Sequence, residues 1–151
     1  MRIYELTEAE CEQVMSGAEF GRLACARCDQ PYIVPVHFYF DAEARCLYSF
    51  SAVGRKIEWM RENPKVCVEI DVIADRFHWT SVLVFGRYEE IPATADANGP
   101  QRRALELFQQ RSEWWLPAAG KVVGAEEHHS PVVYRIHVDR VSGRRAGPSD
   151  R

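Results

Sequence analysis

Apolar and polar residues alternate along several short segments of this chain, and such alternation predicts strands with one buried and one exposed face. The segment VCVEI, at 66–70, alternates cleanly and places Val66, Val68 and Ile70 on one face. The segment YIVPVHFYF, at 32–40, also has one face that is apolar throughout. Strands are predicted over 21–27, 32–40, 46–50, 66–70, 81–91 and 132–139.

Helix signals are fewer and lie between the predicted strands. Thr7 followed by Glu10 is a capping-box pattern, which predicts the start of a first helix. A short second helix is predicted between Ser51 and Pro64, and Pro100 opens a third. Six alternating strands with three short helices indicate a mainly β fold, an antiparallel sheet or small β-barrel with helices at its margins.

Composition and length narrow the class of protein. The chain has 151 residues, 46% of them hydrophobic and 27% charged, which is ordinary for one globular domain and excludes intrinsic disorder. We expect a single domain over residues 1–141, followed by a flexible basic tail at 142–151. A net charge of −3 and a pI near 6.0 provide no basic field, so no nucleic-acid partner is expected.

Targeting signals are absent from the sequence as it stands. No run of about 20 apolar residues marks a membrane span, so no membrane partner is expected. The N-terminal stretch MRIYELTEAECEQ lacks the apolar region of a secretory signal. A cytoplasmic protein is therefore expected.

The five cysteines, at positions 11, 25, 28, 46 and 67, form no regular disulfide framework, so reduced thiols are expected. Cys25 and Cys28 have the spacing of half a zinc site. Four-ligand sites normally repeat such a pair, whereas the other candidates here are the adjacent His128 and His129. We therefore predict no metal site and interpret Cys25 as a strand residue and Cys28 as part of a turn.

Pro35 stands in the middle of the predicted strand at 32–40. Because proline cannot donate a ladder hydrogen bond, this strand is expected at a sheet edge or at a bulge. Something other than a neighbouring strand then meets its backbone, which indicates a ligand.

The stretch YSFSAVGRKIEWMRENP combines a strand, a tight turn and a short helix. Backbone N–H groups at a helix start lack partners and carry the positive end of the helix dipole. Arg55 and Lys56 add two cations there, with Ser49, Ser51 and Gly54 close by in sequence. Phosphate is the natural ligand of such a combination, although the glycine spacing excludes a P-loop. The alternative interpretation is a pair of solvated cations at a helix start.

Four segments, in this order, resemble the FMN-binding split β-barrel family related to pyridoxamine 5′-phosphate oxidase. They are GRLACAR, PYIVPVHFYFD, YSFSAVGRKIEWMRENPKVCVEID and SVLVFGRYEEI. The resemblance covers residues 1–141 and is most specific at Gly-Arg-Lys and at the helix that ends in Asn-Pro. It extends especially to the short flavin-nucleotide-binding group that includes nitroimidazole-resistance proteins. It implies a six-stranded antiparallel split β-barrel.

The resemblance also implies a cofactor site shared by two subunits. In that family FMN lies in a groove between two packed barrels, so a homodimer is implied. An Arg-Lys pair holds the phosphate, and the strand at 34–39 follows the isoalloxazine ring through its backbone. The residues implied to bind the cofactor are Val34, Pro35, Val36, His37, Tyr39, Tyr48, Ser49, Arg55, Lys56 and Ser81. Related barrels bind deazaflavin or haem instead, and the Gly-Arg-Lys pattern favours FMN.

The C-terminal part departs from the oxidases. Their long basic C-terminal region, which holds the substrate phosphate through an Arg-x-His, has no convincing counterpart here. Arg135 and His137 have that spacing but belong to an alternating strand, so we interpret them as its solvent face. Oxidation of vitamin B6 is therefore not implied.

His37 is the candidate catalytic residue, because it shares the strand face expected to look toward the flavin and can exchange protons near neutral pH. The alternative is a half-buried strand histidine that is hydrogen-bonded to backbone. Trp79, Trp114 and Trp115 are candidates for the walls of the groove, with plain packing as the alternative.

Two functions from different classes remain open at this point. The first is an FMN-dependent oxidoreductase, of oxidase or nitroreductase type, acting on a small-molecule substrate. The second is a flavin-binding, storage or sensor protein without turnover of its own. A haem-binding barrel is a third alternative and would place a histidine on iron. Neither the electron donor nor the substrate can be read from these residues.

Overall fold

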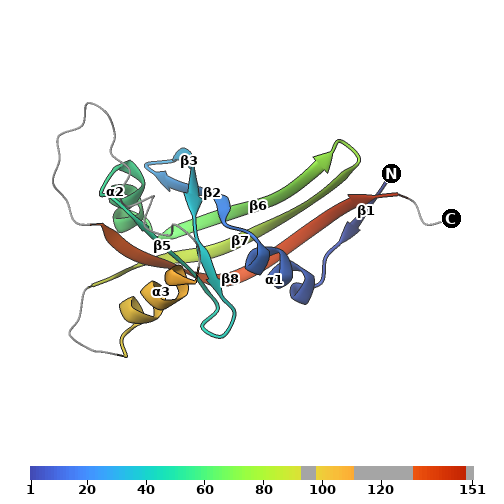
Figure 1. Cartoon of the computed structure of the whole chain (residues 1–151). Coiled ribbons are helices and arrows are strands. Elements are labelled where there is room, and N and C mark those ends of the chain that lie inside the picture. The colour runs from blue at the N-terminus through green and yellow to red at the C-terminus, as the bar shows by residue number, and fades with distance from the viewer. Residues whose placement is uncertain (93–97, 111–130, 149–151) are drawn as a thin grey trace.

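The computed structural model describes residues 1–92, 98–110 and 131–148, and its dominant feature is one antiparallel sheet with three helices (Figure 1). The strands are β1 (Arg2–Glu5), β2 (Phe20–Arg27), β3 (Gln30–His37), β4 (Tyr39–Asp41), β5 (Cys46–Ser51), β6 (Lys65–Asp75), β7 (His78–Ile91) and β8 (Val132–Gly147). The helices are α1 (Glu8–Gly17), α2 (Arg55–Glu62) and α3 (Pro100–Gln109). The predicted mainly β class is confirmed.

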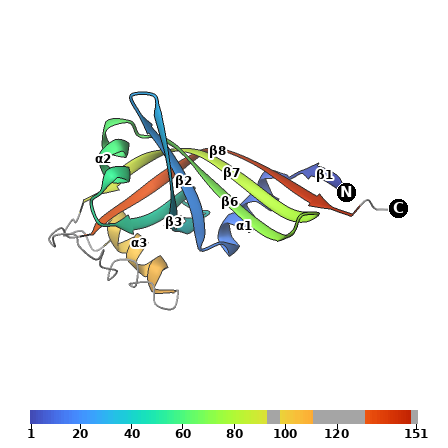
Figure 2. The ribbon, with the colours of Figure 1, turned by 90° about the horizontal axis from the view of Figure 1, so that it is seen from above.

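The sheet bends round on itself without closing. Its strand order is β3-β2-β6-β7-β8-β5-β4, with β1 added on β8. The two end strands, β3 and β4, are consecutive in the chain and meet at Phe38, whose N–H donates to the Glu19 carbonyl at 3.0 Å. Both edges of the sheet therefore converge on one corner, and the arrangement is a split barrel, seen from above in Figure 2.

The predicted strand at 32–40 is two strands, because its two halves pair with different neighbours. Residues up to His37 pair with β2, and those from Tyr39 pair with β5. The apolar face predicted from alternation continues past the bend at Phe38, since Phe38 and Phe40 are both buried. The prediction from Pro35 is also met, because β3 ends the strand order and is an edge strand.

The predicted boundary at residue 141 is wrong. Strand β8 continues to Gly147, with residues 142–146 paired to β7 and residues 144–147 paired to β1. Only residues 149–151 of the proposed tail lie outside the described residues. This segment, SGRRAG, carries no alternation signal, because its buried positions are the small residues Gly143 and Ala146, which are not two apart, and its other side chains are polar.

The core lies inside the barrel, with a smaller cluster under α3. Val66, Val68 and Ile70 all face the interior, as their alternation predicts. The second cluster lies on the other side of β5, where Tyr48 and Phe50 pack against Leu107 and Phe108 of α3. Strand β5 is therefore buried on both faces, and residues 52–54 lead from it directly into α2.

Local signals account for the helix ends and the tight turn. The Thr7 side chain accepts from the Glu10 N–H while Glu10 accepts from the Thr7 N–H, so the predicted capping box is present at α1. Cys28 and Asp29 have φ of 49° and 61°, the two left-handed residues of the two-residue turn that joins β2 to β3. Cys28 is thus a turn residue and Cys25 a buried strand residue, as interpreted from the sequence.

Candidate functional site

A groove of about 500 Å³ runs between the edge strand β3 and the chain that leads from β5 into α2. Pro35, Val36 and His37 line it from β3, and residues 49–54 line it from the opposite side. Because β3 has a strand neighbour on one side only, part of its backbone is available to a ligand in this groove. The ligand expected from Pro35 therefore has a place to bind.

One end of the groove is electropositive. Lys56 lines it, and burial lowers the pKa of this ammonium group below its ordinary value. Helix α2 begins after Gly54 without a side-chain cap, so its first N–H groups have no intrahelical partner. A Cβ placed at Gly54 would meet no atom within 4 Å, which leaves the helix start open to the groove. A half-buried cation beside free N–H donors suits a phosphate.

Arg55 and Lys56 point in different directions. The Arg55 guanidinium lies over the Tyr32 ring, 5.6 Å from its centroid, and Arg55 is not among the residues that line the groove. Successive helical residues are separated by about 100° around the axis, so two adjacent side chains cannot share one face. Within the described residues, Lys56 is the cation of this groove.

His37 lines the groove and is also packed. Its ring meets Phe50 edge to face, with centroids 4.4 Å apart, and its carbonyl accepts the Ser49 hydroxyl at 2.7 Å. His37 is therefore a half-buried residue that also lines the groove. Ser49, the other predicted contact from β5, lines the groove as well.

Three predicted contacts have side chains outside the groove. Tyr39 donates its hydroxyl to Gln110 at 3.0 Å, and Tyr48 is buried against α3, where burial raises its pKa to about 12. Neighbouring strand residues point to opposite faces, so Tyr48 and Ser49 cannot both enter the groove. Val34 packs against the barrel core. Any contact of these three with a ligand in the groove would be made by their backbone.

Ser81 lies in a second groove, also of about 500 Å³, on the outer face of β7 and β8. Trp79, Leu83 and Arg144 line it with Ser81, whose hydroxyl donates to Glu69 at 2.9 Å. The structure therefore does not bring Ser81 together with Lys56 within one chain. Trp79, a candidate wall of the cofactor groove, lines this second groove and not the groove of Lys56, whereas Trp114 and Trp115 lie outside the described residues.

Tyr134 is a groove residue that the sequence did not single out. It comes from β8, is 1% exposed, and lines the groove together with Ser49 and Lys56. Its hydroxyl is buried, and the Ser49 side chain, directly opposite on β5, is the side chain that interacts with it. The alternation of 132–139 indicated a buried position here, but no sequence signal distinguishes a tyrosine that faces a ligand from one that fills the core.

The described residues assemble no group of three or more potential metal ligands. His128 and His129, the proposed partners of Cys25 and Cys28, lie outside those residues. Within the same residues, no helix is long and apolar enough to cross a membrane.

Comparison with known proteins relates this architecture to a family. The model of the family described as pyridoxamine 5′-phosphate oxidase matches residues 7–145, nearly the whole chain. The chain belongs to the pyridoxamine 5′-phosphate oxidase family. The resemblance stated from the Gly-Arg-Lys segment is thereby confirmed.

Relatives of this pyridoxamine 5′-phosphate oxidase family member can be aligned with it along nearly its full length. An uncharacterised protein of Rhizobium meliloti is 38% identical, with 97% of each chain covered. The crystal structure of an FAD-binding protein of Mesorhizobium loti is 36% identical, covers 98% of this chain and 99% of its own, and has a TM-score of 0.78. An FAD-binding protein of Mycobacterium smegmatis, at 21% identity with 94% and 96% covered and a TM-score of 0.65, shares the fold.

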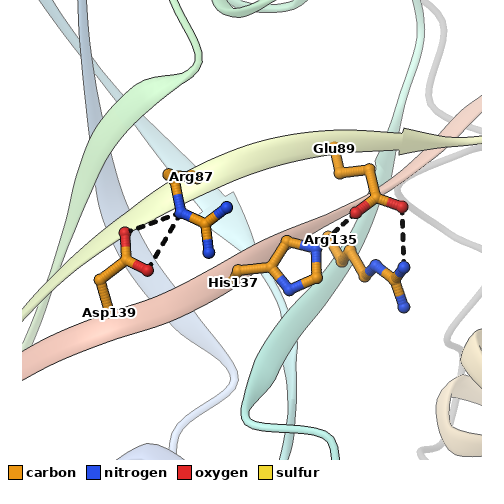
Figure 3. Close-up of polar contacts among 5 residues, drawn as sticks. All are labelled: Arg87, Glu89, Arg135, His137 and Asp139. Carbon is orange, nitrogen blue, oxygen red and sulfur yellow. Dashed lines mark hydrogen bonds and ion pairs between the residues drawn. The ribbon is translucent and has the colours of Figure 1, made fainter.

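In this family member, the side chains of Arg135 and His137 are not fully exposed to solvent. Both side chains are partly buried and pair with one carboxylate, Glu89, with Arg135 Nη2 2.7 Å from Glu89 Oε1 (Figure 3). Arg135, and then His137, hold the pKa of Glu89 below its ordinary value. Both side chains therefore already have a carboxylate partner, and a free Arg-x-His pair for a substrate phosphate is not formed here.

Proposed function

We propose that this protein binds a flavin nucleotide in the groove beside β3, with the phosphate at Lys56 and the start of α2. The observation that carries the proposal is the electropositive end of the groove, where a half-buried ammonium group and uncapped helix N–H groups meet. The volume of about 500 Å³ suits a nucleotide-sized ligand. Family membership and the FAD-binding relative at 36% identity support a flavin.

We propose FMN as the form of the flavin. It has one terminal phosphate, and Lys56 is the cation that lines the groove among the described residues. FAD carries the same flavin and phosphate with an added nucleotide, and it is the cofactor named for the Mesorhizobium loti relative. Arg55, beside the groove and stacked on Tyr32, has a smaller role in this proposal than Lys56.

The activity we propose is that of a flavin-dependent oxidoreductase acting on a small molecule. A bound flavin supplies hydride or electron transfer. The chain's own part is to hold the phosphate at Lys56, to line the groove with the edge of β3, and to place the His37 ring where the reacting end of the cofactor is expected. A binding or storage protein would use the same groove without turnover.

We further propose that two copies share the site. The sheet pairs Ile73 with Trp79, Trp79 with Ala146, and Ala146 with Ile3, so these four side chains form one row on a single face. Ile3 and Ile73 are 54% and 67% exposed there. The groove of Ser81 and Trp79 lies on this same outer face, where a second copy can bring it to the cofactor.

The proposal is tested by comparing FMN with riboflavin, which lacks the phosphate. Lys56→Ala should weaken FMN binding about 10- to 150-fold, because it removes a charge-assisted hydrogen bond of about 1.5–3 kcal/mol. Riboflavin affinity should change little. Arg55→Ala should have a smaller effect on FMN, since its guanidinium rests on Tyr32.

Lys65→Ala is the matched control, because Lys65 is an exposed cation at the start of β6. An unchanged preference for FMN over riboflavin in Lys56→Ala would overturn the phosphate site. A spectrum of the purified protein separates flavin from haem. Oxidation of NADH or NADPH with an added nitro compound or quinone then separates an enzyme from a binding protein.

A further inference from the structure

Phe20 is a large aromatic residue that the fold leaves uncovered beside the groove. It is the first residue of β2, and it is 60% exposed. Within the part of the chain that the structure describes, it belongs to neither hydrophobic cluster. A single exposed apolar residue is common on protein surfaces, but Phe20 also lines the groove beside β3. Its ring is therefore available to a ligand that binds there.

The pairing of β2 with β3 sets the direction of the Phe20 side chain. Phe20 lies directly opposite His37, so the two side chains project from the same face of the sheet. Beside this pair, the Phe38 N–H donates to the Glu19 carbonyl at 3.0 Å. Strand pairing and this hydrogen bond hold the backbone in place. Phe20 and His37 are thus adjacent parts of one groove wall.

Phe50, the other phenylalanine that lines the groove among the described residues, is already packed. It is 5% exposed, and its ring meets Phe108 of α3 edge to face, with centroids 4.9 Å apart. It also meets the His37 ring edge to face. Of the two phenylalanines, Phe20 is therefore the one with most of its surface free for a ligand.

The start of α2 and Phe20 lie far apart along β3. The Tyr32 ring contacts the Arg55 guanidinium and, with centroids 5.5 Å apart, the Trp59 ring, so α2 packs beside Tyr32. Phe20 faces His37, five residues further along the same strand, which corresponds to about 16 Å of extended backbone. In FMN the ribityl chain separates the isoalloxazine ring from the phosphate. With the phosphate at the start of α2, the ring belongs at the Phe20 end of the groove.

We infer that Phe20 is a flavin-binding residue whose ring packs against the isoalloxazine ring at the end of the groove away from Lys56. The inference rests on the proposed function and adds a contact from β2, the strand beside β3. Aromatic rings attract each other in offset or edge-to-face arrangements, beyond the effect of the apolar area that they bury. Flavin binding also removes from water a side chain that is otherwise 60% exposed.

Phe20→Ala tests the inference, because it removes the ring and leaves the strand. The affinities for FMN and for riboflavin should both fall about 10-fold, since the two ligands carry the same ring system. Phe20→Tyr keeps an aromatic ring and should retain both affinities within about threefold. Because Phe20 is exposed, the unfolding midpoint of flavin-free Phe20→Ala should stay within about 2 °C of wild type.

Ile33→Ala is the matched control. Ile33 is 64% exposed and lies four residues before His37 on β3, so its side chain projects from the same face. It does not line the groove. Its substitution should leave the affinities for FMN and riboflavin at their wild-type values.

Three results would overturn the inference. The first is wild-type riboflavin affinity in Phe20→Ala together with wild-type FMN affinity, and the second is a loss confined to FMN, which would place Phe20 at the phosphate. The third is a dimeric wild type whose Phe20→Ala variant is a monomer by light scattering, which would show that a second copy covers the ring. Lys56→Ala in the same titration keeps the proposed function separate, because a selective loss of FMN there supports the phosphate site whatever Phe20 does.

Discussion

At the scale of single residues, orientation decides what a charged or polar side chain can do. Arg55 and Lys56 are adjacent in sequence, yet one rests on an aromatic ring and the other lines the groove. Arg135 and His137 share one carboxylate instead of facing solvent. In both cases the residue type indicated the chemistry, and the direction of the side chain determined whether a ligand could use it.

The ion pairs of Glu89 can be tested through the pH dependence of the protein's stability. Its carboxylate pairs with Arg135 and His137, and its pKa is lowered in the folded protein. A lowered folded pKa contributes stability above the unfolded value of 4.5, and this contribution is lost as the pH falls through the folded value.

Glu89→Gln should therefore lower the free energy of unfolding at pH 7 by at most about 1 kcal/mol, because the Glu89 side chain is 47% exposed and solvent screens the pair. The difference from wild type should shrink toward zero as the pH falls below 4.5. Urea unfolding at a series of pH values measures both. A difference that grows on acidification would contradict the assignment.

At the scale of elements, two glycines show how strand and helix ends are packed. Gly86 lies at the irregularity in the β7–β8 pairing, and a Cβ there would overlap the His137 carbonyl and the Ile136 side chain. Gly54 precedes α2 with extended backbone and open space around it. The first glycine is required by the packing of the sheet, and the second leaves room beside the helix start.

Gly54→Val should accordingly separate binding from stability. The added side chain would occupy the space at the helix start where the phosphate is proposed, so FMN affinity should fall about 10-fold or more. The free energy of unfolding should change by less than about 1 kcal/mol, as expected for a helix N-cap exchange. Flavin titration and thermal unfolding check the two parts.

Gly86→Ala is the comparison for that experiment. It should destabilise the protein by about 1–3 kcal/mol through overpacking, whatever its effect on flavin. If Gly54→Val were instead the more destabilising of the two, the space at the start of α2 would have a structural role. If Gly54→Val bound FMN as tightly as the wild type does, the phosphate would not lie at this helix start.

At the scale of the whole molecule, β6, β7 and β8 continue past the barrel as a long twisted ribbon that ends near both chain termini (Figure 1). Two exposed apolar residues on this ribbon point to opposite faces. Ile73 shares the outer row with Trp79, whereas Val72 pairs with Thr80 in the next row, on the side of Arg145, which pairs with Glu10 of α1. Their exposed fractions are similar, 67% and 59%.

This pair gives a test of the shared site. Wild-type protein should have about twice the chain mass of 17.4 kDa by light scattering. Ile73→Lys should yield a monomer with weakened flavin binding, because it places a charge in the proposed interface. Val72→Lys, on the opposite face, should remain a dimer with wild-type affinity. A monomeric wild type that binds FMN tightly would contradict the shared groove.

Short-range patterns in the sequence determined much of the secondary structure of this protein. Alternation located six segments that include part or all of every strand except β1, the capping box located α1, and Pro35 located an edge strand, because each depends on neighbours a few residues apart. The Gly-Arg-Lys segment located a helix start beside small residues for the same reason. These features could be predicted because burial and backbone hydrogen bonding act on them locally.

Long-range contacts decided the rest. The division of 32–40 into two strands, the extension of β8 to Gly147 and the separation of Ser81 from Lys56 depend on which strands meet, and no local pattern encodes that. Tyr134 is the clearest case. Alternation predicts that it is buried, but only the pairing of β8 with β5 places it opposite Ser49 at the edge of the groove, because the strand that a residue faces is a property of the tertiary structure.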